Sequence, residues 1–297
     1  MKKAILVHNP TSGDGKHSKK ELKERIEELG YKVKYYSTNR FFWKHFTSKK
    51  ADMVFIAGGD GTVQKVAKAI LEKGREKIMN TPITVLPCGT ANNIATTLKI
   101  GSTQQGLEGN LQKTGFDIGS IEGAKEASFF IEGMGCGIFP KLVRVMSAKD
   151  EDEKQNEIQK SLRELLKVID TYEAQEAIII ADKEEVTGKF LLVELLNIKY
   201  IGPNIELAPG AQTGDGSFEL VTVQEDSRQE LKDFITGLLN GKKPKPIEKF
   251  ADLKKVKEVR LKWAGGDVHI DDEIVESYKG EELVIKNRQA MFNFMTT

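Results

Sequence analysis

The chain has 297 residues, which at roughly 150 residues per domain suggests two domains. Its 45 lysine and arginine residues balance 44 aspartate and glutamate residues, and this net charge of +1 excludes nucleic-acid binding through overall charge. Hydrophobic residues make up 39% of the chain, so extensive disorder is excluded as well.

The sequence predicts a soluble, cytoplasmic protein without a transmembrane segment. The longest uncharged stretch, 78–98, contains Pro82, Pro87 and Gly89, so it is too polar and too broken for a membrane helix. The apolar run at residues 4–7 is too short for a signal peptide. Two cysteines cannot build a disulfide framework, which favours a reducing compartment.

The first third of the chain alternates strand and helix signals. Helical spacing of apolar residues appears at 18–29 and again at 63–71. Short apolar or alternating runs, typical of strands, occupy residues 4–7, 31–36, 53–57 and 83–86. Strand, glycine turn and helix in repetition predict an α/β domain with a parallel sheet.

After about residue 116 the pattern changes to strands with few helices between them. The expected strands cover residues 129–131, 177–181, 190–196, 218–223 and 256–261. The exception is 150–170, where apolar residues at helical spacing predict a helix that packs on its own domain. This pattern favours an antiparallel second domain.

Three glycine-rich turns follow predicted strands, at residues 9–15, 58–62 and 87–92. Glycine lets backbone N–H groups approach a ligand closely, and turns of a parallel sheet gather at its carboxyl edge. Three such turns together suggest a polyphosphate site. The Walker A and G-x-G-x-x-G patterns are both absent, so a P-loop protein or a Rossmann dehydrogenase is not expected.

Asp60 lies inside the second turn, where a carboxylate would repel phosphate unless it had another role. It could hold Mg²⁺ through water or take a proton from an attacking hydroxyl. The structural alternative is that Asp60 caps the helix that follows it.

Four blocks in order carry a family resemblance: Gly58–Thr62, Pro87–Asn92, Asn197–Gly216 and His269–Glu273. Together they resemble the diacylglycerol kinase catalytic-domain family, which includes bacterial soluble lipid kinases and the sphingosine and ceramide kinases. The resemblance implies a nucleotide-binding α/β domain, with a parallel sheet like that of NAD kinases and diacylglycerol kinases, over 1–118 and 282–297. It also implies a mainly antiparallel β-sandwich, the lipid-substrate domain, over 119–281.

The resemblance implies an ATP-dependent, Mg²⁺-assisted lipid kinase that phosphorylates the hydroxyl of diacylglycerol or a related long-chain alcohol. Asp60 and Glu273 would be the catalytic residues, with Glu273 polarising the acceptor hydroxyl, and Asp215 would be a structural residue or a metal ligand. The expected nucleotide-binding residues are Asn9, Thr11, Gly13, Thr38, Gly59, Gly61, Thr62, Thr90, Asn92 and Asp271.

The implied partner is a lipid substrate at the membrane surface, which places the protein peripherally on the inner face of a membrane; nucleic acid is not a partner and a homodimer stays open. The basic stretch 241–262 is either a solvated face or a contact for anionic lipid headgroups. For the aromatic cluster of Phe41, Phe42, Trp43 and Phe46, packing in the core or against a helix is favoured over contact with lipid.

The sequence also departs from the family pattern. Asn93 stands where aspartate is frequent, Asp272 replaces a glycine, Pro203 replaces the second glycine of a pair and Glu132 an asparagine. These departures affect the adenine-side contacts and the identity of the acceptor. They leave two alternatives open, a soluble-substrate kinase of the NAD kinase type and a non-catalytic regulator that binds nucleotide or lipid.

Overall fold

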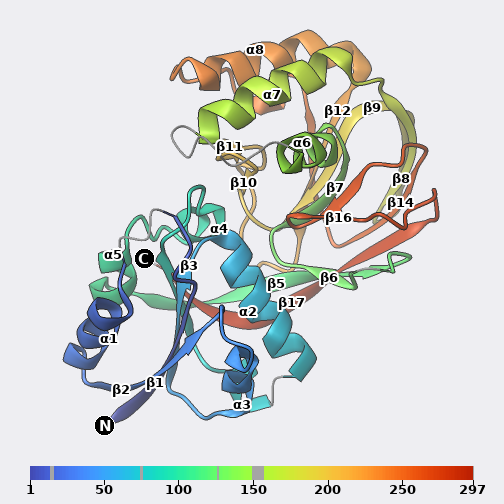
Figure 1. Cartoon of the computed structure of the whole chain (residues 1–297). Helices are drawn as coiled ribbons and strands as arrows, with labels where there is room; N and C mark the ends of the chain where they lie inside the picture. Colours follow the sequence, from blue (N-terminus) through green and yellow to red (C-terminus); the bar gives the residue numbers. More distant parts are fainter. Residues whose placement is uncertain (14–16, 74–75, 126, 149–156, 297) are drawn as a thin grey trace. The chain divides into compact units, whose positions relative to one another are not determined.

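The computed structural model describes residues 1–296 except 14–16, 74–75, 126 and 149–156. The chain forms two compact units, one of residues Met1–Phe116 with Ala290–Thr297 and one of residues Asp117–Gln289 (Figure 1). Residues 282–289, which the sequence assigns to the first domain, fall in the second unit, because residues 283–286 pair there with a neighbouring strand.

The first unit is built on a parallel sheet in the order β2–β1–β3–β4. Its strands are β1 (Lys2–His8), β2 (Tyr31–Ser37), β3 (Met53–Gly58) and β4 (Ile83–Pro87). The end of β17 (Leu283–Thr296) adds a further parallel strand, with Phe294 opposite Ile83. The four strands expected in this part of the sequence are therefore present and parallel.

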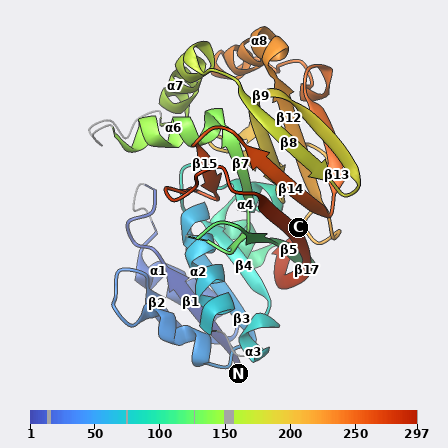
Figure 2. The ribbon, with the colours of Figure 1, turned by 90° about the vertical axis from the view of Figure 1, so that its right-hand side faces the viewer.

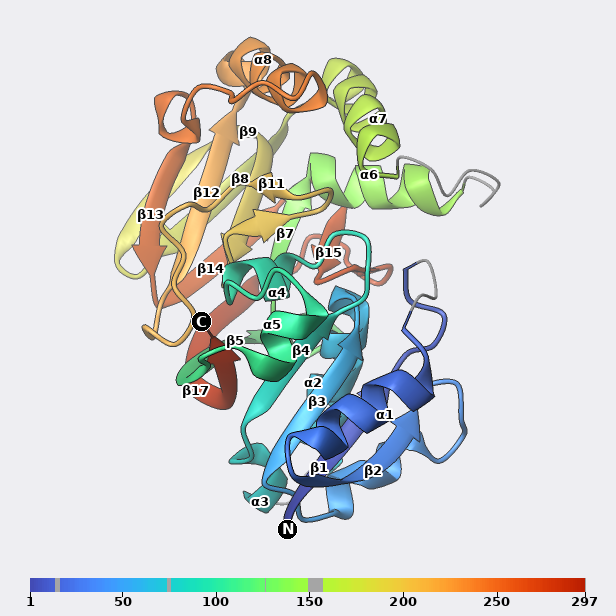
Figure 3. The same ribbon diagram turned by 90° about the vertical axis from the view of Figure 1, so that its left-hand side faces the viewer.

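Helices lie on both faces of this sheet (Figure 3). They are α1 (Lys19–Glu28), η1 (Trp43–Ser48), α2 (Asp60–Lys73), α3 (Glu76–Met79), α4 (Asn93–Thr97) and α5 (Thr103–Glu108). Ser18 caps α1 by accepting a hydrogen bond from the backbone N–H of Glu21. Leu22 and Ile26 of α1 share one core cluster with Leu107 of α5, against Leu6 of β1. Successive side chains of a strand point to opposite faces of the sheet. Ile5 and Val7 of β1, which are both buried, therefore point to the face opposite that of Leu6.

One expectation for the first unit is wrong. Phe41 and Phe42 are 92% and 64% exposed, so neither packs in the core, and the Phe42 ring only meets that of His45 in η1, with centroids 5.1 Å apart. Phe46 is fully buried and Trp43 stacks on it, as expected for the rest of this cluster. The tight turn at Ser37–Arg40 and the start of η1 turn the two phenylalanine side chains away from the sheet.

The second unit is an antiparallel sheet. Its strands are the later part of β5 (Gln112–Glu122), β6 (Phe129–Phe130), β7 (Gly133–Gly137), β8 (Gln175–Ala181), β9 (Glu184–Leu196), β12 (Phe218–Gln224), β13 (Asp252–Val256), β14 (Glu258–Trp263), β15 (Val268–Ile270), β16 (Glu273–Ile274) and the first part of β17, beside a small β10 (Tyr200–Ile201) and β11 (Ile205–Glu206) pair. Residues of β8, β9, β12, β14 and β17 meet in one apolar cluster, so the sheet curls around its own core.

Three helices cover the other face of this sheet (Figure 1). They are α6 (Ile138–Ser147), α7 (Glu157–Thr171) and α8 (Arg228–Leu239), accompanied by the short η2 (Glu225–Ser227) and η3 (Ile247–Lys249). Leu162, Leu165 and Ile169 of α7 are buried against them, as the helical spacing predicts. The expected start of this helix, at residues 150–156, lies outside the described residues.

The predicted fold class, a parallel α/β part followed by a mainly antiparallel β part, is confirmed. Within the described parts of the chain, no helix combines the length and the apolarity that crossing a bilayer needs.

The last strand contributes to the core of the first unit through Phe294, which is 1% exposed and whose ring centroid lies 4.6 Å from that of Phe116. We expect Phe294→Ala to lower the free energy of unfolding of this unit by about 3–5 kcal/mol, because it leaves a cavity. Urea denaturation followed by Trp43 fluorescence, in a variant without Trp263, reports on this unit. The exposed-site control Phe41→Ala should change little, and equal midpoints for both variants would contradict the assignment.

Candidate functional site

The carboxyl ends of β1, β3 and β4 lie next to one another in the sheet. β2 lies on one side of β1 and β3 lies on the other side. The direction in which strands are added to the sheet therefore reverses between β1 and β3. In open parallel sheets such a switch point is where ligands bind. The three glycine-rich turns that follow these strands are therefore at the expected edge.

Side chains of the first turn are hydrogen-bonded to the second turn. Asn9 Nδ2 donates to Thr62 Oγ1 at 3.3 Å, and the backbone N–H of Gly59 donates to Ser12 Oγ at 2.9 Å. Asn9 Oδ1 also accepts from the backbone N–H and the hydroxyl of Thr11, which closes the first turn on itself. Ser12 was not among the predicted site residues, although it lies within the first turn.

The second and third turns touch through two glycines. A Cβ atom on Gly89 would lie 2.5 Å from Gly59 Cα, closer than side-chain carbons approach backbone. Gly13 has φ +62°, and a Cβ there would lie 2.2 Å from the Cys88 carbonyl oxygen. The backbone of Asn92 is also left-handed, and its side chain closes the third turn. Asn92 Oδ1 accepts from the N–H of Gly89 at 2.9 Å, and Asn92 Nδ2 donates to the carbonyl of Gly89 at 2.7 Å. Glycine is thus required where the three turns meet.

Asp60 joins the second turn to the helix that follows the third. Its two carboxylate oxygens accept hydrogen bonds from the backbone N–H groups of Asn93 and Ile94, each at 2.9 Å. These N–H groups belong to the first turn of α4 and have no acceptor within that helix. Asp60 therefore caps α4, whereas the structural alternative had been that it caps its own helix, α2.

The remaining predicted residues of the first unit lie at the same edge. Gly61 is in the first turn of α2, Thr90 is exposed in the third turn, and Thr38 follows β2. The backbone N–H of Thr38 donates to the carbonyl of His8 at 3.0 Å, directly beside Asn9. The structure thus brings together all the predicted nucleotide-binding residues of this unit, from Asn9 to Asn92.

In the second unit, Asp271 is at the tip of the hairpin between β15 and β16, with φ 52°. Its carboxylate accepts hydrogen bonds from the backbone N–H groups of Ile131, Glu132 and Gly133, the shortest at 2.8 Å. Burial raises the pKa of Asp271 to about 7, although these N–H groups lower it. The carboxylate is thus engaged by the protein's own backbone, and its contact with a nucleotide stays a prediction.

Glu273 begins β16 two residues further on and is exposed. Its carboxylate forms no hydrogen bond or ion pair with the residues that the structure describes. That Asp60 and Glu273 act in one active site stays a prediction.

A buried pair that the sequence did not reveal lies behind this hairpin. His269 Nε2 is 2.9 Å from Glu194 Oε2, and His269 Nδ1 is 2.8 Å from the carbonyl oxygen of Asp271. Gly135 lies opposite both residues in the sheet, and a Cβ there would be 2.0 Å from Glu194 Oε2. The absence of a side chain on Gly135 therefore makes room for a glutamate in the apolar run 190–196.

Asp215 was expected to be a structural residue or a metal ligand, and its neighbours are a lysine and a serine. Lys255 Nζ lies 2.8 Å from Asp215 Oδ2, and the backbone and hydroxyl of Ser217 donate to Oδ1. Burial raises the pKa of Asp215, but these partners lower it more, so the net shift is downward. Among the described residues no three His, Cys, Asp or Glu side chains gather to hold a metal ion. The metal role of Asp215 stays a prediction that these neighbours do not favour.

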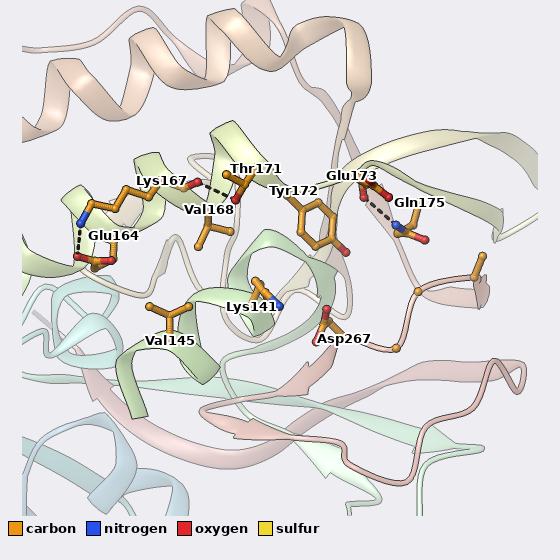
Figure 4. Close-up of a pocket in the computed structure, with 13 residues that line it drawn as sticks. Lys141, Val145, Glu164, Lys167, Val168, Thr171, Tyr172, Glu173, Gln175 and Asp267 are labelled. Carbon is orange, nitrogen blue, oxygen red and sulfur yellow. Dashed lines mark hydrogen bonds and ion pairs between the residues drawn. The ribbon is translucent and has the colours of Figure 1, made fainter. Parts of the chain in front are cut away.

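A cavity of about 600 Å³ lies between α6, α7 and the loop Ala264–Asp267 of the second unit (Figure 4). Lys167, paired with Glu164 at 2.9 Å, is at one end, and Tyr172 and Asp267 are at the other. None of the predicted site residues lines it. Because its lining mixes charged and apolar side chains, the cavity does not by itself identify a ligand.

The three turns of the first unit have the features that are typical of phosphate-binding sites. Backbone N–H groups of glycine turns and the N-terminus of the fourteen-residue helix α2 present positive potential at the edge of the sheet. Sites of this kind occur in proteins that bind nucleoside phosphates.

Comparison with known proteins gives the same family as the resemblance in the sequence. The family model described as "Diacylglycerol kinase catalytic domain" matches residues 3–119, which contain all three turns. Proteins named diacylglycerol kinase from Staphylococcus aureus strains RF122 and MRSA252 are each 27% identical over 265 residues, covering 83% of this chain and 79% of theirs. Residues 3–119 are thus similar to the diacylglycerol kinase catalytic domain, in agreement with the resemblance seen in the sequence.

Solved structures share the fold of the whole chain. A diacylglycerol kinase from Bacillus anthracis strain Sterne matches with a TM-score of 0.69 at 18% identity, over 100% of this chain and 97% of that one. A second crystal structure from the same strain matches with a TM-score of 0.76 at 20% identity, over 100% and 95% of the two chains. At these identities the likeness concerns the fold.

The link from Asp60 to α4 can be tested by substitution. We expect Asp60→Ala to lower the free energy of unfolding by about 1–2 kcal/mol, because two N–H groups lose their acceptor. Hydrogen exchange of the Asn93 and Ile94 amides should become faster. Asp52→Ala, which removes a carboxylate that accepts from the N–H of Lys3, is the control and should leave both amides unchanged. Unchanged exchange in Asp60→Ala would show that the cap is not formed in solution.

Proposed function

We propose that this protein is an ATP-dependent lipid kinase that transfers the γ-phosphoryl group of ATP to the hydroxyl of diacylglycerol or a related long-chain lipid alcohol. The observation that carries the proposal is the convergence of three glycine turns, with Gly59 and Gly89 in contact, at the switch point of the sheet. The family match over residues 3–119 and the relatives named diacylglycerol kinase support the choice of substrates.

In this proposal ATP binds along the carboxyl edge of the first unit. Backbone N–H groups of Gly13 and Gly61 would donate to the phosphate oxygens, as glycine turns do in other phosphate sites. Gly59, whose N–H donates to Ser12 Oγ, would line the site and let the phosphate approach the backbone closely. Further contacts would come from the side chains of Asn9, Thr11, Thr38, Thr62, Thr90 and Asn92. Asp271 would assist from the second unit.

The residues present fit an Mg²⁺ ion that is held mainly by phosphate oxygens and water. Mg²⁺ in nucleotide sites commonly keeps several waters and takes few protein carboxylates. Asp60 accepts two N–H groups, but a carboxylate has about four acceptor positions and can also accept from a water ligand of the ion. When bound, Mg²⁺ would neutralise charge on the phosphates. Asp60 would keep the second and third turns aligned.

Glu273 is the proposed general base. The acceptor oxygen would attack the γ-phosphorus, its proton would pass to the Glu273 carboxylate, and the bond from the γ-phosphorus to the bridging oxygen would break to release ADP. An exposed carboxylate that no other described residue engages remains available for this role. The acceptor would be met at a membrane surface, with the protein peripheral on the cytoplasmic side.

The role of Glu273 is tested by Glu273→Gln, which removes the base but keeps the size of the side chain. We expect kcat for diacylglycerol in mixed micelles to fall about 10²–10⁴-fold, with stability unchanged because Glu273 is exposed. Glu185→Gln, an exposed glutamate of the same unit, should retain wild-type turnover. Similar turnover in Glu273→Gln and wild type would remove Glu273 from the mechanism.

The phosphate site is tested by Gly89→Ala. Its added methyl group collides with the backbone of Gly59, so we expect ATP–Mg²⁺ to bind at least about tenfold more weakly in calorimetry, equivalent to about 1.4 kcal/mol. Gly266→Ala, where nothing lies within 4 Å of the added atom, is the control. Equal ATP affinity in the two variants would be evidence against the three-turn cradle. Wild-type protein that phosphorylates NAD but no lipid would overturn the lipid acceptor.

A further inference from the structure

The connection from β2 to β3 can be followed in Figure 2. It carries two neighbouring aromatic side chains that are exposed. Phe41 is 92% exposed and Phe42 64%, and their rings meet edge to face with centroids 4.9 Å apart. Leaving two adjacent phenylalanine side chains in water is unfavourable, and contiguous exposed apolar groups commonly mark an interaction site. The function proposed above gives them no role.

The backbone beneath these rings is fixed. The N–H of Arg40 donates to the carbonyl of Ser37 at 3.0 Å, and the N–H of Trp43 donates to the carbonyl of Arg40 at 3.1 Å. Trp43 in turn stacks on the fully buried Phe46, with centroids 6.0 Å apart. The segment is therefore anchored on the unit by Trp43 and Phe46, while Phe41 and Phe42 project from it.

The same stretch is strongly basic. Residues 31–51 contain no aspartate or glutamate. They contain six basic residues, Lys32, Lys34, Arg40, Lys44, Lys49 and Lys50. Of these, Lys44 forms an ion pair, to Glu72 at 3.8 Å. In the other basic stretch, 241–262, Lys254, Lys255 and Arg260 all lie within 4.0 Å of a carboxylate oxygen, so its charge is more fully compensated.

Two of these basic residues, Lys34 and Lys44, lie close to aromatic rings of the same stretch. Lys44 Nζ lies 5.9 Å from the centre of the Trp43 ring. Lys34 Nζ lies 5.8 Å from the centre of the Tyr36 ring, which itself meets Phe46 edge to face. Positive charge thus lies beside the aromatic side chains that anchor this segment, and Arg40 directly precedes Phe41 in the sequence.

We propose that residues 40–44, with the basic residues that flank them, are a docking surface for the anionic face of a lipid bilayer. Phe41 and Phe42 would enter the boundary of headgroups and acyl chains, and the lysine and arginine side chains would meet the anionic headgroups. Aromatic side chains favour this boundary and cationic ones are attracted to anionic lipid. This contact would bring the enzyme to its lipid acceptor, and that purpose rests on the proposed function. The contact between residues 40–44 and the bilayer does not depend on the proposed function.

The test is co-sedimentation with vesicles of equal parts phosphatidylglycerol and phosphatidylcholine, without ATP. We expect the Phe41→Ser/Phe42→Ser variant to bind at least about tenfold more weakly than wild type, since it lacks the two aromatic side chains that would become buried in the bilayer. The matched control is Ile178→Ser/Val186→Ser, which removes two apolar side chains of the second unit that are 44% and 42% exposed, and it should bind like wild type. Lys49→Glu/Lys50→Glu should also weaken binding, and vesicles of phosphatidylcholine alone should bind wild type poorly.

Equal vesicle binding by wild type and the double phenylalanine variant would overturn the proposal. So would a dimer, detected by ultracentrifugation, that disappears in this variant while vesicle binding is kept, because the covering partner would then be a second copy of the chain. Absence of lipid phosphorylation by wild type would refute the proposed function and leave the vesicle result to decide this inference. Both Ser substitutions are at exposed positions, so folding should be preserved.

Discussion

The candidate site depends on one carboxylate that holds two turns of the sheet edge together. Asp60 belongs to the start of α2, yet both its oxygens accept from the first N–H groups of α4. This contact fixes the second turn against the third, where Gly59 lies so close that a side chain on Gly89 would collide with it. Ser12 and Asn9 tie the first turn to the second. The N–H groups that would receive phosphate are therefore arranged before any ligand arrives, which reduces the cost of ordering them on binding.

The hairpin of the second unit is held in a comparable way, by polar groups that fix a short loop. Arg144 of α6 bonds Asp267 at 3.1 Å and Glu276 at 2.7 Å, on either side of the β15–β16 hairpin. At its tip, the left-handed conformation of Asp271 is stabilised by backbone N–H groups and by His269, which Glu194 supports from β9. An exposed Glu273 on such a firmly held hairpin is consistent with a base that needs an accurate position.

Much of this fold could be predicted from the sequence, because the spacing of apolar residues and the residue types of turns are local features of the chain. The parallel strands at 4–7, 53–57 and 83–86 follow from short apolar runs, and each run is followed by a turn that contains glycine. The partner of Asp60 could not be predicted, since it lies 33 residues away and is chosen by the packing of the sheet. Likewise, the exposure of Phe41 and Phe42 depends on a turn whose direction no hydrophobic pattern encodes. The burial of Glu194 could not be predicted for a similar reason, because the space for its side chain is left by Gly135 on another strand.

The central claim is that the three turns together bind a triphosphate, and amide chemical shifts measure this directly. In ¹⁵N-labelled protein titrated with ATP–Mg²⁺, the account predicts saturable shifts of the Gly13, Gly59, Gly61 and Gly89 amides with a common dissociation constant. Asn93, whose N–H is bound to Asp60, should shift with them. Saturable chemical-shift changes at other residues, with the amide shifts of these four glycines unchanged, would contradict the account.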